Sequence, residues 1–374
     1  MADDSKLKGD FSKNAAPGDS PANITRTDVI IIGAGPVGLF AVLECGMQEM
    51  HCHIVDALGK PGGQCAELYP EKAIWDIPAL PGVTGQELVD KLMTQIKPFK
   101  PDFHLGEMAE KLEQQPDGAW RLTTDAGTVL EAPVVVVAAG CGAFMPKKPS
   151  IKNIADYEGK SVFYTVRSKE AFRGKKVLIA GGGDSALDWT LELQGIAGDV
   201  NLMHRRDEFR GAPDSVSRMR KLVDDGKVDL HIADIVKLKG KDGQLESVTV
   251  KDATGKTYDI ECDVLLPFYG LAMKLGPLAK WGLNLDHNQI KVDTEKFESS
   301  EHGIFAIGDI NSYPGKRRII LSGFHEAALM AHAAVPIVFP SKKPSNTHSS
   351  SSKQFPSDKP EAPDKGKKPE APQP

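Results

Sequence analysis

The sequence lacks the closely spaced cysteine pair on which many redox proteins depend. It has five cysteines among 374 residues, and none of them forms a C-x-x-C pair. An odd number of cysteines at such wide spacing favours neither a disulfide framework nor a zinc site. We therefore expect free thiols and no metal centre; the cysteines are Cys45, Cys52, Cys65, Cys141 and Cys262.

The chain also lacks a long hydrophobic run and a strong excess of charge. No stretch approaches the roughly 20 apolar residues that a membrane span needs, and the formal net charge is only -5. Neither a membrane nor nucleic acid is therefore expected as a partner. The polar N-terminal stretch has no apolar core, so we expect a disordered leader over residues 1–24 of a cytoplasmic protein.

Apolar residues become scarce again after about Pro340, where proline, serine and lysine dominate. Such a segment buries too little apolar surface to offset the entropy of ordering itself. We expect a short C-terminal extension over residues 341–354 and a disordered tail over residues 355–374.

The remaining length suits two domains, and each contains a glycine turn. The first lies in DVIIIGAGPVGLFAVLECGMQEMHCHIVDALG, which predicts a strand, a tight turn, a helix and a second strand. Gly33, Gly35 and Gly38 form G-x-G-x-x-G, and Pro36 begins the helix. The three glycines respectively allow the turn, let a pyrophosphate approach the backbone, and let the helix pack on the strand.

An acidic residue selects the ligand of this first turn. Asp56 follows Gly33 by 23 residues and ends the second predicted strand. A carboxylate there accepts hydrogen bonds from both hydroxyls of an adenosine ribose. The first site is thus predicted to bind a dinucleotide without a 2′-phosphate, either FAD or NAD.

The second turn lies in KVLIAGGGDSALDW, where Gly181, Gly183 and Ala186 form G-x-G-x-x-A and Asp184 and Ser185 begin the helix. A strand is expected over residues 177–180. The pattern predicts a second dinucleotide site.

A basic cluster takes the place of the acid in the second site. The count of 23 residues from Gly181 reaches His204, and Arg205, Arg206 and Arg210 follow. Guanidinium groups pair with a 2′-phosphate, which a carboxylate would repel. The second site is therefore predicted to prefer NADPH to NADH; the alternative is that HRRDEFR is a charged solvated loop.

Two nucleotide sites of different preference predict a hydride relay. FAD is then expected in the first site, because an enzyme that takes electrons from NADPH needs a centre that accepts two electrons and releases them singly. Asp309, at the end of IFAIGDI, is expected to bond a ribityl hydroxyl. The segment SGFHEAALMAHAAVPIVF predicts a helix that begins close to the flavin.

The two glycine turns, PGGQ, IFAIGDI and HRRDEFR resemble the thioredoxin-reductase-like flavoproteins over about residues 28–339. The resemblance implies an α/β fold of two three-layer dinucleotide-binding domains, with the NADPH domain inserted into the FAD domain. The FAD domain is expected at residues 25–143 and 264–340 and the NADPH domain at 144–263, with hinges near 142–146 and 262–268. Thioredoxin reductases carry a redox-active C-A-T-C, but Tyr164 and Arg167 occupy its two cysteine positions here.

A more specific resemblance is to thioredoxin-reductase-like ferredoxin–NADP+ reductases. It is carried by GGQCAELYPEKAIWDIP, GGGDSALDW, YPGKRRIILSGFHEAAL and THSSSS. That family is homodimeric, and a side chain from the C-terminal extension covers one flavin face, a place that the resemblance gives to His348. The extension is thought to reach the partner's flavin. Tyr69 is implied to stack on the other face, and the further implied FAD contacts are Gln64, Ala109, Phe144 and Ser350.

The resemblance implies an enzyme that takes hydride from NADPH onto FAD and gives single electrons to ferredoxin or flavodoxin. The flavin carries the chemistry, so no catalytic acid, base or nucleophile is expected. Two alternatives stay open: another NADPH-dependent flavin reductase of the thioredoxin reductase superfamily, and a non-catalytic sensor that binds NADPH and FAD.

Overall fold

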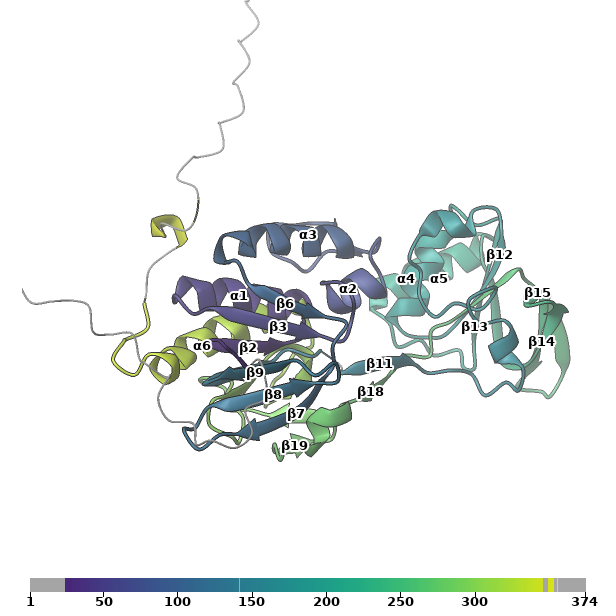
Figure 1. Ribbon diagram of the computed structural model, residues 1–374. Coiled ribbons are helices and arrows are strands. Elements are labelled where there is room, and N and C mark those ends of the chain that lie inside the picture. Colours follow the sequence, from purple (N-terminus) through teal and green to yellow (C-terminus); the bar gives the residue numbers. More distant parts are fainter. Residues whose placement is uncertain (1–23, 141, 346–348, 353–354, 356–374) are drawn as a thin grey trace, which may run out of the picture.

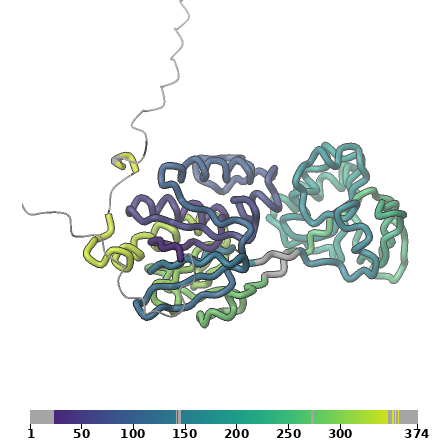
Figure 2. The backbone as a smooth tube through the Cα atoms, viewed as in Figure 1, coloured from purple at the N-terminus to yellow at the C-terminus, as the bar shows by residue number. Residues whose placement is uncertain are grey.

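The computed structural model describes residues 24–140, 142–345, 349–352 and 355. Figure 1 shows two α/β domains side by side. Figure 2 shows that the chain builds part of the first domain, passes through the second, and returns to complete the first. The second domain is thus inserted into the first, as predicted.

A parallel sheet forms the centre of the first domain. The fully buried strand predicted at residues 29–32 forms as expected, and lies in the middle of this sheet. Ile31 faces one buried layer while Ile30 and Ile32 face another, because side chains alternate along a strand. The strand order is β21 (Ile304–Ala306), β10 (Val134–Val137), β2 (Val29–Ile32), β3 (Cys52–Asp56) and β6 (Asp102–Leu105).

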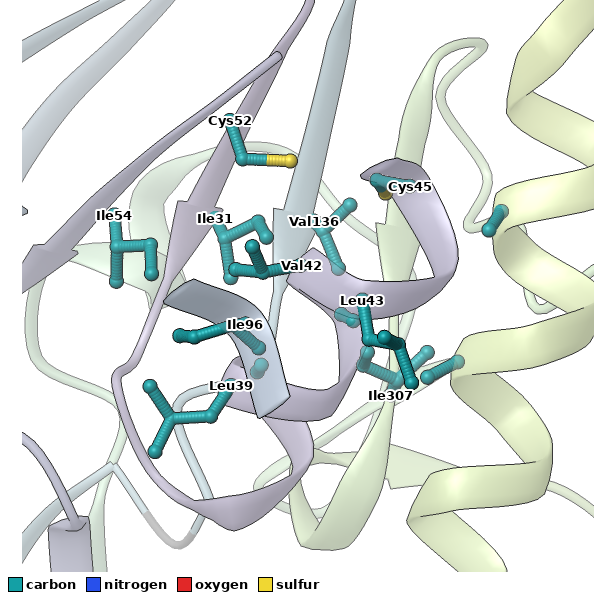
Figure 3. Packing of buried hydrophobic residues seen from close by; sticks show 14 of the residues in the cluster. Ile31, Leu39, Val42, Leu43, Cys45, Cys52, Ile54, Ile96, Val136 and Ile307 are labelled. Carbon is teal, nitrogen blue, oxygen red and sulfur yellow. The ribbon is translucent and has the colours of Figure 1, made fainter. Parts of the chain in front are cut away.

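Helices cover one face of this sheet. They are α1 (Pro36–Met47), α3 (Gly85–Ile96) and α6 (Ile320–Val338). Figure 3 shows Leu39 and Val42 of α1, with Ile96 of α3, beside Ile31 and Val136 of the sheet. Apolar side chains of three helices and several strands therefore form one core.

A second, smaller sheet covers the other face. Leu122 and Leu130 of this sheet pack with Ile30 and Ile32. Its order is β1 (Ile24–Arg26), β9 (Val129–Ala132), β8 (Trp120–Thr124) and β7 (Ala109–Gln114). Shorter elements complete the domain: α2 (Gly63–Glu67), β4 (Ala73–Ile74), β5 (Val83–Thr84), β19 (Leu285–Asp286), β20 (Gln289–Lys291) and β22 (Asn311–Ser312).

The second domain repeats the three-layer plan around a six-stranded sheet. Helices α4 (Asp184–Leu193) and α5 (Pro213–Asp224) cover the face that carries Val177 and Ile179. The strand order is β16 (Thr257–Glu261), β15 (Gln244–Asp252), β14 (Asp229–Lys241), β13 (Asp199–His204), β12 (Lys176–Ala180) and β17 (Val264–Pro267). The strands β14, β13, β12 and β17 are parallel, and the β14–β15–β16 hairpins are antiparallel.

Two antiparallel strands, β11 (Ala143–Pro146) and β18 (Leu271–Lys274), connect the domains. The first overlaps the expected hinge at 142–146. The predicted return to the first domain at residue 264 is too early, because Val264–Pro267 pairs with β12 inside the second sheet. A buried parallel strand has the same composition in either domain, so the sequence did not distinguish the two sheets.

Helix α6 is long and apolar enough to cross a membrane by length and composition alone. The expectation that no stretch of the chain approaches the length of a membrane span is therefore wrong for α6. Ala327, Met330 and Ala331 of this helix belong to the core of the first domain. The same helix carries Glu326, which is fully buried and ion-paired. We therefore interpret α6 as a core helix.

Candidate functional site

The first glycine turn lies between β2 and α1 and has no room for side chains at two of its three glycines. Gly33 has a φ of +111°, and a Cβ there would lie 2.3 Å from the carbonyl oxygen of Ala138. A Cβ on Gly38 would lie 1.9 Å from the carbonyl oxygen of Gly33. A Cβ on Gly35 would meet nothing within 4 Å. The backbone at Gly35 is thus open to a ligand, while Gly33 and Gly38 permit the packing that positions it.

The N-terminus of α1 adds donors to this opening. Gly35 is the N-cap and provides no side-chain cap, and Pro36 opens the helix. The first amides of a helix have no partner within the helix. Together with the helix dipole, they make this end of α1 suited to a pyrophosphate.

Asp56 is held in place by two backbone amides. Its carboxylate accepts hydrogen bonds from the amides of Ala34 (2.6 Å) and Leu58 (2.8 Å). Burial raises the pKa of Asp56, and the two amide hydrogen bonds lower it. The carboxylate therefore has a fixed orientation at the end of β3, where the count from Gly33 predicted it.

A cavity of about 1030 Å³ begins at this turn. Its volume lies near the upper end of the ~300–1,000 Å³ that small-molecule and cofactor sites occupy. Both domains line it, and α4 and the start of α5 contribute Asp188, Leu191 and Ser215. Of the predicted residues, it brings together Gly33, Gly35, Pro36, Asp56, Gln64, Tyr69, Ala109, Asp309 and Asp184. The open backbone at Gly35, the oriented carboxylate of Asp56 and the volume of the cavity together fit an extended dinucleotide such as FAD.

The other predicted residues do not line this cavity. Gly38 packs beneath the turn. The remaining second-site residues lie in the second domain, on its glycine turn, at the start of α4 or in the loop after β13. These are Gly181, Gly183, Ser185, Arg205, Arg206 and Arg210. The backbone of Phe144 pairs with Met273 in the connecting strands, but its side chain and the whole of His348 lie outside the described residues.

Ser350, which the resemblance implies as an FAD contact, lies away from this chain's own pocket. The extension leaves α6 and lies along the far end of α1, where Gln48 exchanges hydrogen bonds of 2.9 and 2.8 Å with the backbone of Ser345. The pocket is at the other end of α1. Ser350 is exposed and is not among the lining residues. Sequence reasoning had placed it by resemblance alone.

The second glycine turn reproduces the first. A Cβ on Gly181 would lie 2.6 Å from the carbonyl oxygen of Phe268, and one on Gly183 would meet nothing within 4 Å. Gly183 caps α4 without a side-chain hydrogen bond. The carboxylate of Asp184 accepts a hydrogen bond from the amide of Ala212 (2.7 Å), which ties the start of α5 to the turn.

The basic cluster lies directly after β13. His204 ends that strand, and its ring folds back over Gly182, where a Cβ would lie 2.4 Å from Nε2. Burial and the nearby Arg205 and Arg210 lower the pKa of His204. All three predicted arginines are exposed. Within the described part of the chain, none of them forms an ion pair, so their guanidinium groups are available to an anion.

The segment that replaces the missing dithiol connects the two domains. Arg167 forms an ion pair with Glu67 of α2. The amide of Lys169 donates to Glu71 (2.8 Å), and Tyr164 donates to Glu158 (2.7 Å). The positions of Tyr164 and Arg167 are thus used for polar contacts.

Cys65 lines the pocket and is a free thiol, as are the other described cysteines. Its thiol is buried and lies 3.5 Å from the hydroxyl of Tyr69. Burial raises the pKa of Cys65 to about 11. A thiol of this pKa is protonated near neutrality and is a poor nucleophile. Cys65 is therefore unsuited to redox exchange.

The chain is similar in sequence to a described family and to known reductases. Residues 27–334 match the family described as pyridine nucleotide-disulphide oxidoreductase. A ferredoxin–NADP reductase of Parvibaculum lavamentivorans is 62% identical over 317 residues, which cover 85% of this chain and 92% of that protein. A ferredoxin–NADP reductase of Mesorhizobium japonicum is 58% identical over 320 residues, covering 86% of this chain and 93% of that protein. This chain belongs to the ferredoxin–NADP reductase family.

Solved structures confirm the predicted thioredoxin-reductase-like fold. Thioredoxin reductase of Lactococcus lactis superposes with a TM-score of 0.72 at 24% identity, over 84% of this chain and 99% of that one. Thioredoxin reductase of T. acidophilum gives 0.71 at 22% identity, over 82% and 96%. At this identity the likeness concerns the fold alone.

The site also contains a buried carboxylate, Glu326, that was not predicted from the sequence. Glu326 of α6 accepts hydrogen bonds from the amide of Gly308 (2.7 Å), Asn311 Nδ2 (2.9 Å) and the Tyr313 hydroxyl (2.8 Å). It also forms an ion pair with Lys316. These contacts fix the turn that carries Asp309. The only sequence signal was an acid inside the apolar helix SGFHEAALMAHAAV.

We predict that Gly35→Ala and Gly38→Ala have different effects in this reductase. Gly38→Ala forces a Cβ against the Gly33 carbonyl, so the apoprotein should lose about 1–3 kcal/mol of unfolding free energy. Gly35→Ala fills space that a ligand's phosphates would need, so it should weaken FAD binding while leaving apoprotein stability nearly unchanged. Urea unfolding and fluorescence titration with FAD measure the two effects. Equal destabilisation by both changes would contradict the packing described for the turn.

We also predict that Glu326→Ala destabilises the apoprotein by about 3–5 kcal/mol, because it leaves Lys316 buried without its partner. The double variant Glu326→Ala/Lys316→Met should recover part of this loss. Lys342→Met, which breaks the exposed pair of Lys342 with Glu49, is the control and should cost about 1 kcal/mol or less. Urea unfolding of the four proteins tests the network. A loss from Glu326→Ala no larger than that of the control would refute it.

Proposed function

We propose that this chain transfers electrons between NADPH and a ferredoxin or flavodoxin, with FAD bound in the pocket of the first domain. The observation that carries the proposal is the 62% identity to a ferredoxin–NADP reductase over 92% of that protein. Two open glycine turns in one chain support it, because the reaction needs two nucleotides. FAD, when bound, accepts a hydride and releases electrons singly.

The side chains of the first site hold and orient the flavin nucleotide in this proposal. The amides around Gly35 and the start of α1 bind the pyrophosphate, and Asp56 accepts hydrogen bonds from the adenosine ribose. Asp309, whose pKa is raised by burial, accepts from the ribityl chain. Gln64 and Tyr69 lie against the ring. Orientation and exclusion of water are the protein's contribution.

The second turn binds NADPH through its basic cluster. Arg205 and Arg206 are exposed directly beyond β13, and Arg210 donates its backbone amide to the carbonyl of Gly182 (2.7 Å). That hydrogen bond brings the arginine loop onto the glycine turn. We assign the 2′-phosphate of NADPH to the guanidinium groups of this loop, because the count from Gly181 ends where the loop begins.

Electrons leave the flavin without an internal disulfide. Tyr164 and Arg167 occupy the positions of a dithiol, and the Cys65 thiol is protonated and has no second thiol beside it among the described cysteines. The acceptor is therefore an external redox protein. This distinguishes the proposal from disulfide reduction, which needs an accessible thiol pair.

We further propose a cytoplasmic homodimer. Four of the cysteines are buried free thiols, which suits a reducing compartment. Ser350 is exposed and lies away from this chain's own pocket, which supports a contact of this residue with the flavin of a partner subunit. Light scattering tests the dimer, and fractionation of the native cells tests the compartment.

We predict that the double variant Arg205→Ala/Arg206→Ala loses its preference for NADPH. Each charged contact with a 2′-phosphate is worth about 1.5–3 kcal/mol, so kcat/KM for NADPH should fall by about tenfold or more for each arginine. The kcat/KM for NADH should change little. Arg173→Ala is the control, because Arg173 is exposed and pairs with Glu170 elsewhere on the second domain. The outcome that contradicts the assignment is an equal loss with both nucleotides.

The decisive experiment measures electron delivery. NADPH and the FAD-loaded protein should reduce a low-potential ferredoxin, and Cys65→Ser should retain the wild-type rate because the buried thiol takes no part. Reduction of thioredoxin instead of ferredoxin would favour disulfide reduction. Binding of FAD and NADPH without reduction of ferredoxin, flavodoxin or ferricyanide would favour the sensor.

A further inference from the structure

Three histidines and an aspartate gather at the amino ends of two neighbouring strands of the first domain. His51 directly precedes β3, His53 lies within it, and Asp102 and His104 lie at the start of β6. The parallel register places His53 beside Asp102. Residues two apart on a strand share one face, so the pattern H-x-H on one strand meets D-x-H on the next.

The spacing of the ligand atoms fits a small metal ion. His51 Nε2 lies 3.5 Å and His53 Nε2 lies 3.3 Å from Asp102 Oδ2. One ligand atom from each of these three residues lies within 4.8 Å of the other two. Zinc bonds of about 2.0–2.2 Å in tetrahedral geometry place neighbouring ligand atoms roughly 3.4 Å apart. Two of the three separations already match that value.

The opposite ring nitrogens have partners of their own. His51 Nδ1 lies 3.4 Å from the hydroxyl oxygen of Thr27, and that hydroxyl donates to the His51 carbonyl (3.0 Å). The Thr27 oxygen is thus free to accept the His51 Nδ1 proton. His53 Nδ1 lies 3.0 Å from His104 Nε2. Metal-binding histidines commonly have such a partner, which leaves the second nitrogen's lone pair for the ion.

We propose that His51, His53 and Asp102 bind a zinc ion, with Thr27 and His104 orienting the two imidazoles. Mixed nitrogen and oxygen donors suit zinc, whereas calcium and magnesium take oxygen ligands. The side chains of His51 and Asp102 are 46% and 59% exposed, so an ion has an entry path and water completes the coordination. Without metal, His51 Nε2 lies 3.3 Å from the Lys100 carbonyl, which is the competing partner.

The ion joins the edge strand β6 to β3. His53 is three residues from Asp56 along β3, roughly 10 Å, on the side away from the glycine turn. The site therefore stabilises the sheet edge and takes no part in electron transfer. The cysteine pattern led us to expect no metal centre. That expectation did not consider His51 and His53, because their closeness to Asp102 depends on the pairing of β3 with β6.

Isothermal titration of tag-free, FAD-loaded protein with zinc chloride, after removal of metals by chelation and dialysis, tests this proposal. The wild type should bind a single saturable equivalent. His51→Asn and Asp102→Asn should each weaken binding by at least about tenfold, and Thr27→Val by about tenfold through loss of the orienting hydroxyl. His287→Asn is the matched control, because His287 is an exposed histidine beside a single acid, Asp286, and it should bind zinc as the wild type does.

Zinc-edge anomalous diffraction from crystals of the wild type should show a peak among His51, His53 and Asp102. Binding only at millimolar zinc, or equal affinity in the wild type, His51→Asn and Asp102→Asn, would overturn the site. The rate of ferredoxin reduction should be unchanged in His51→Asn. The zinc titration does not depend on that activity, so failure of the proposed function and failure of this site remain distinguishable.

Discussion

The close contact between a strand-ending turn and the helix that follows it is the constraint on which the rest of this molecule depends. The contact exists because Gly38 lacks a side chain, which lets the Gly33 carbonyl lie against α1, while Gly33 itself packs against the backbone of Ala138. It aims the first amides of α1 into the cavity and leaves the backbone at Gly35 bare. In the second domain Gly181 is packed in a similar way, since a Cβ there would lie 2.6 Å from the Phe268 carbonyl oxygen and 2.9 Å from the Ala186 Cβ, while the backbone at Gly183 is bare. Each nucleotide site is therefore a consequence of how a helix packs on a sheet.

The relation between the two domains depends on polar interactions and on Tyr69 of the first domain, which packs against the core of the second. Arg167 pairs with Glu67, and Lys72 pairs with Asp188 of α4 at 2.5 Å. These groups are partly exposed, and such ion pairs contribute little stability singly. The covalent connection is a single two-stranded ribbon, β11 and β18. An interface of this kind holds the cavity between the domains without locking them, in contrast to the dry apolar core in Figure 3.

Features that follow from local rules could be predicted from the sequence. The strand at residues 29–32, both glycine turns and the strand-end places of Asp56 and His204 depend on spacing within a single β-turn-α-β unit. Features that depend on pairing between distant segments could not. The place of Val264–Pro267 in the second sheet and the meeting of His53 with Asp102 require the register of strands far apart in sequence. The partners of Glu326 lie only 10 to 18 residues before it, but their contacts depend on how α6 packs against the turn that precedes it.

The segment at the position of the missing dithiol also has a role that becomes visible only in the folded chain. In the sequence alone, Tyr164 and Arg167 indicate only that two cysteines are absent. In the folded chain Arg167 reaches Glu67 of α2, and the amide of Lys169 reaches Glu71 just beyond that helix. This segment thus connects the domains beside the cavity. Tyr164 and Arg167 stand at the two positions of that dithiol, so a disulfide there has no part in carrying electrons away from a bound flavin.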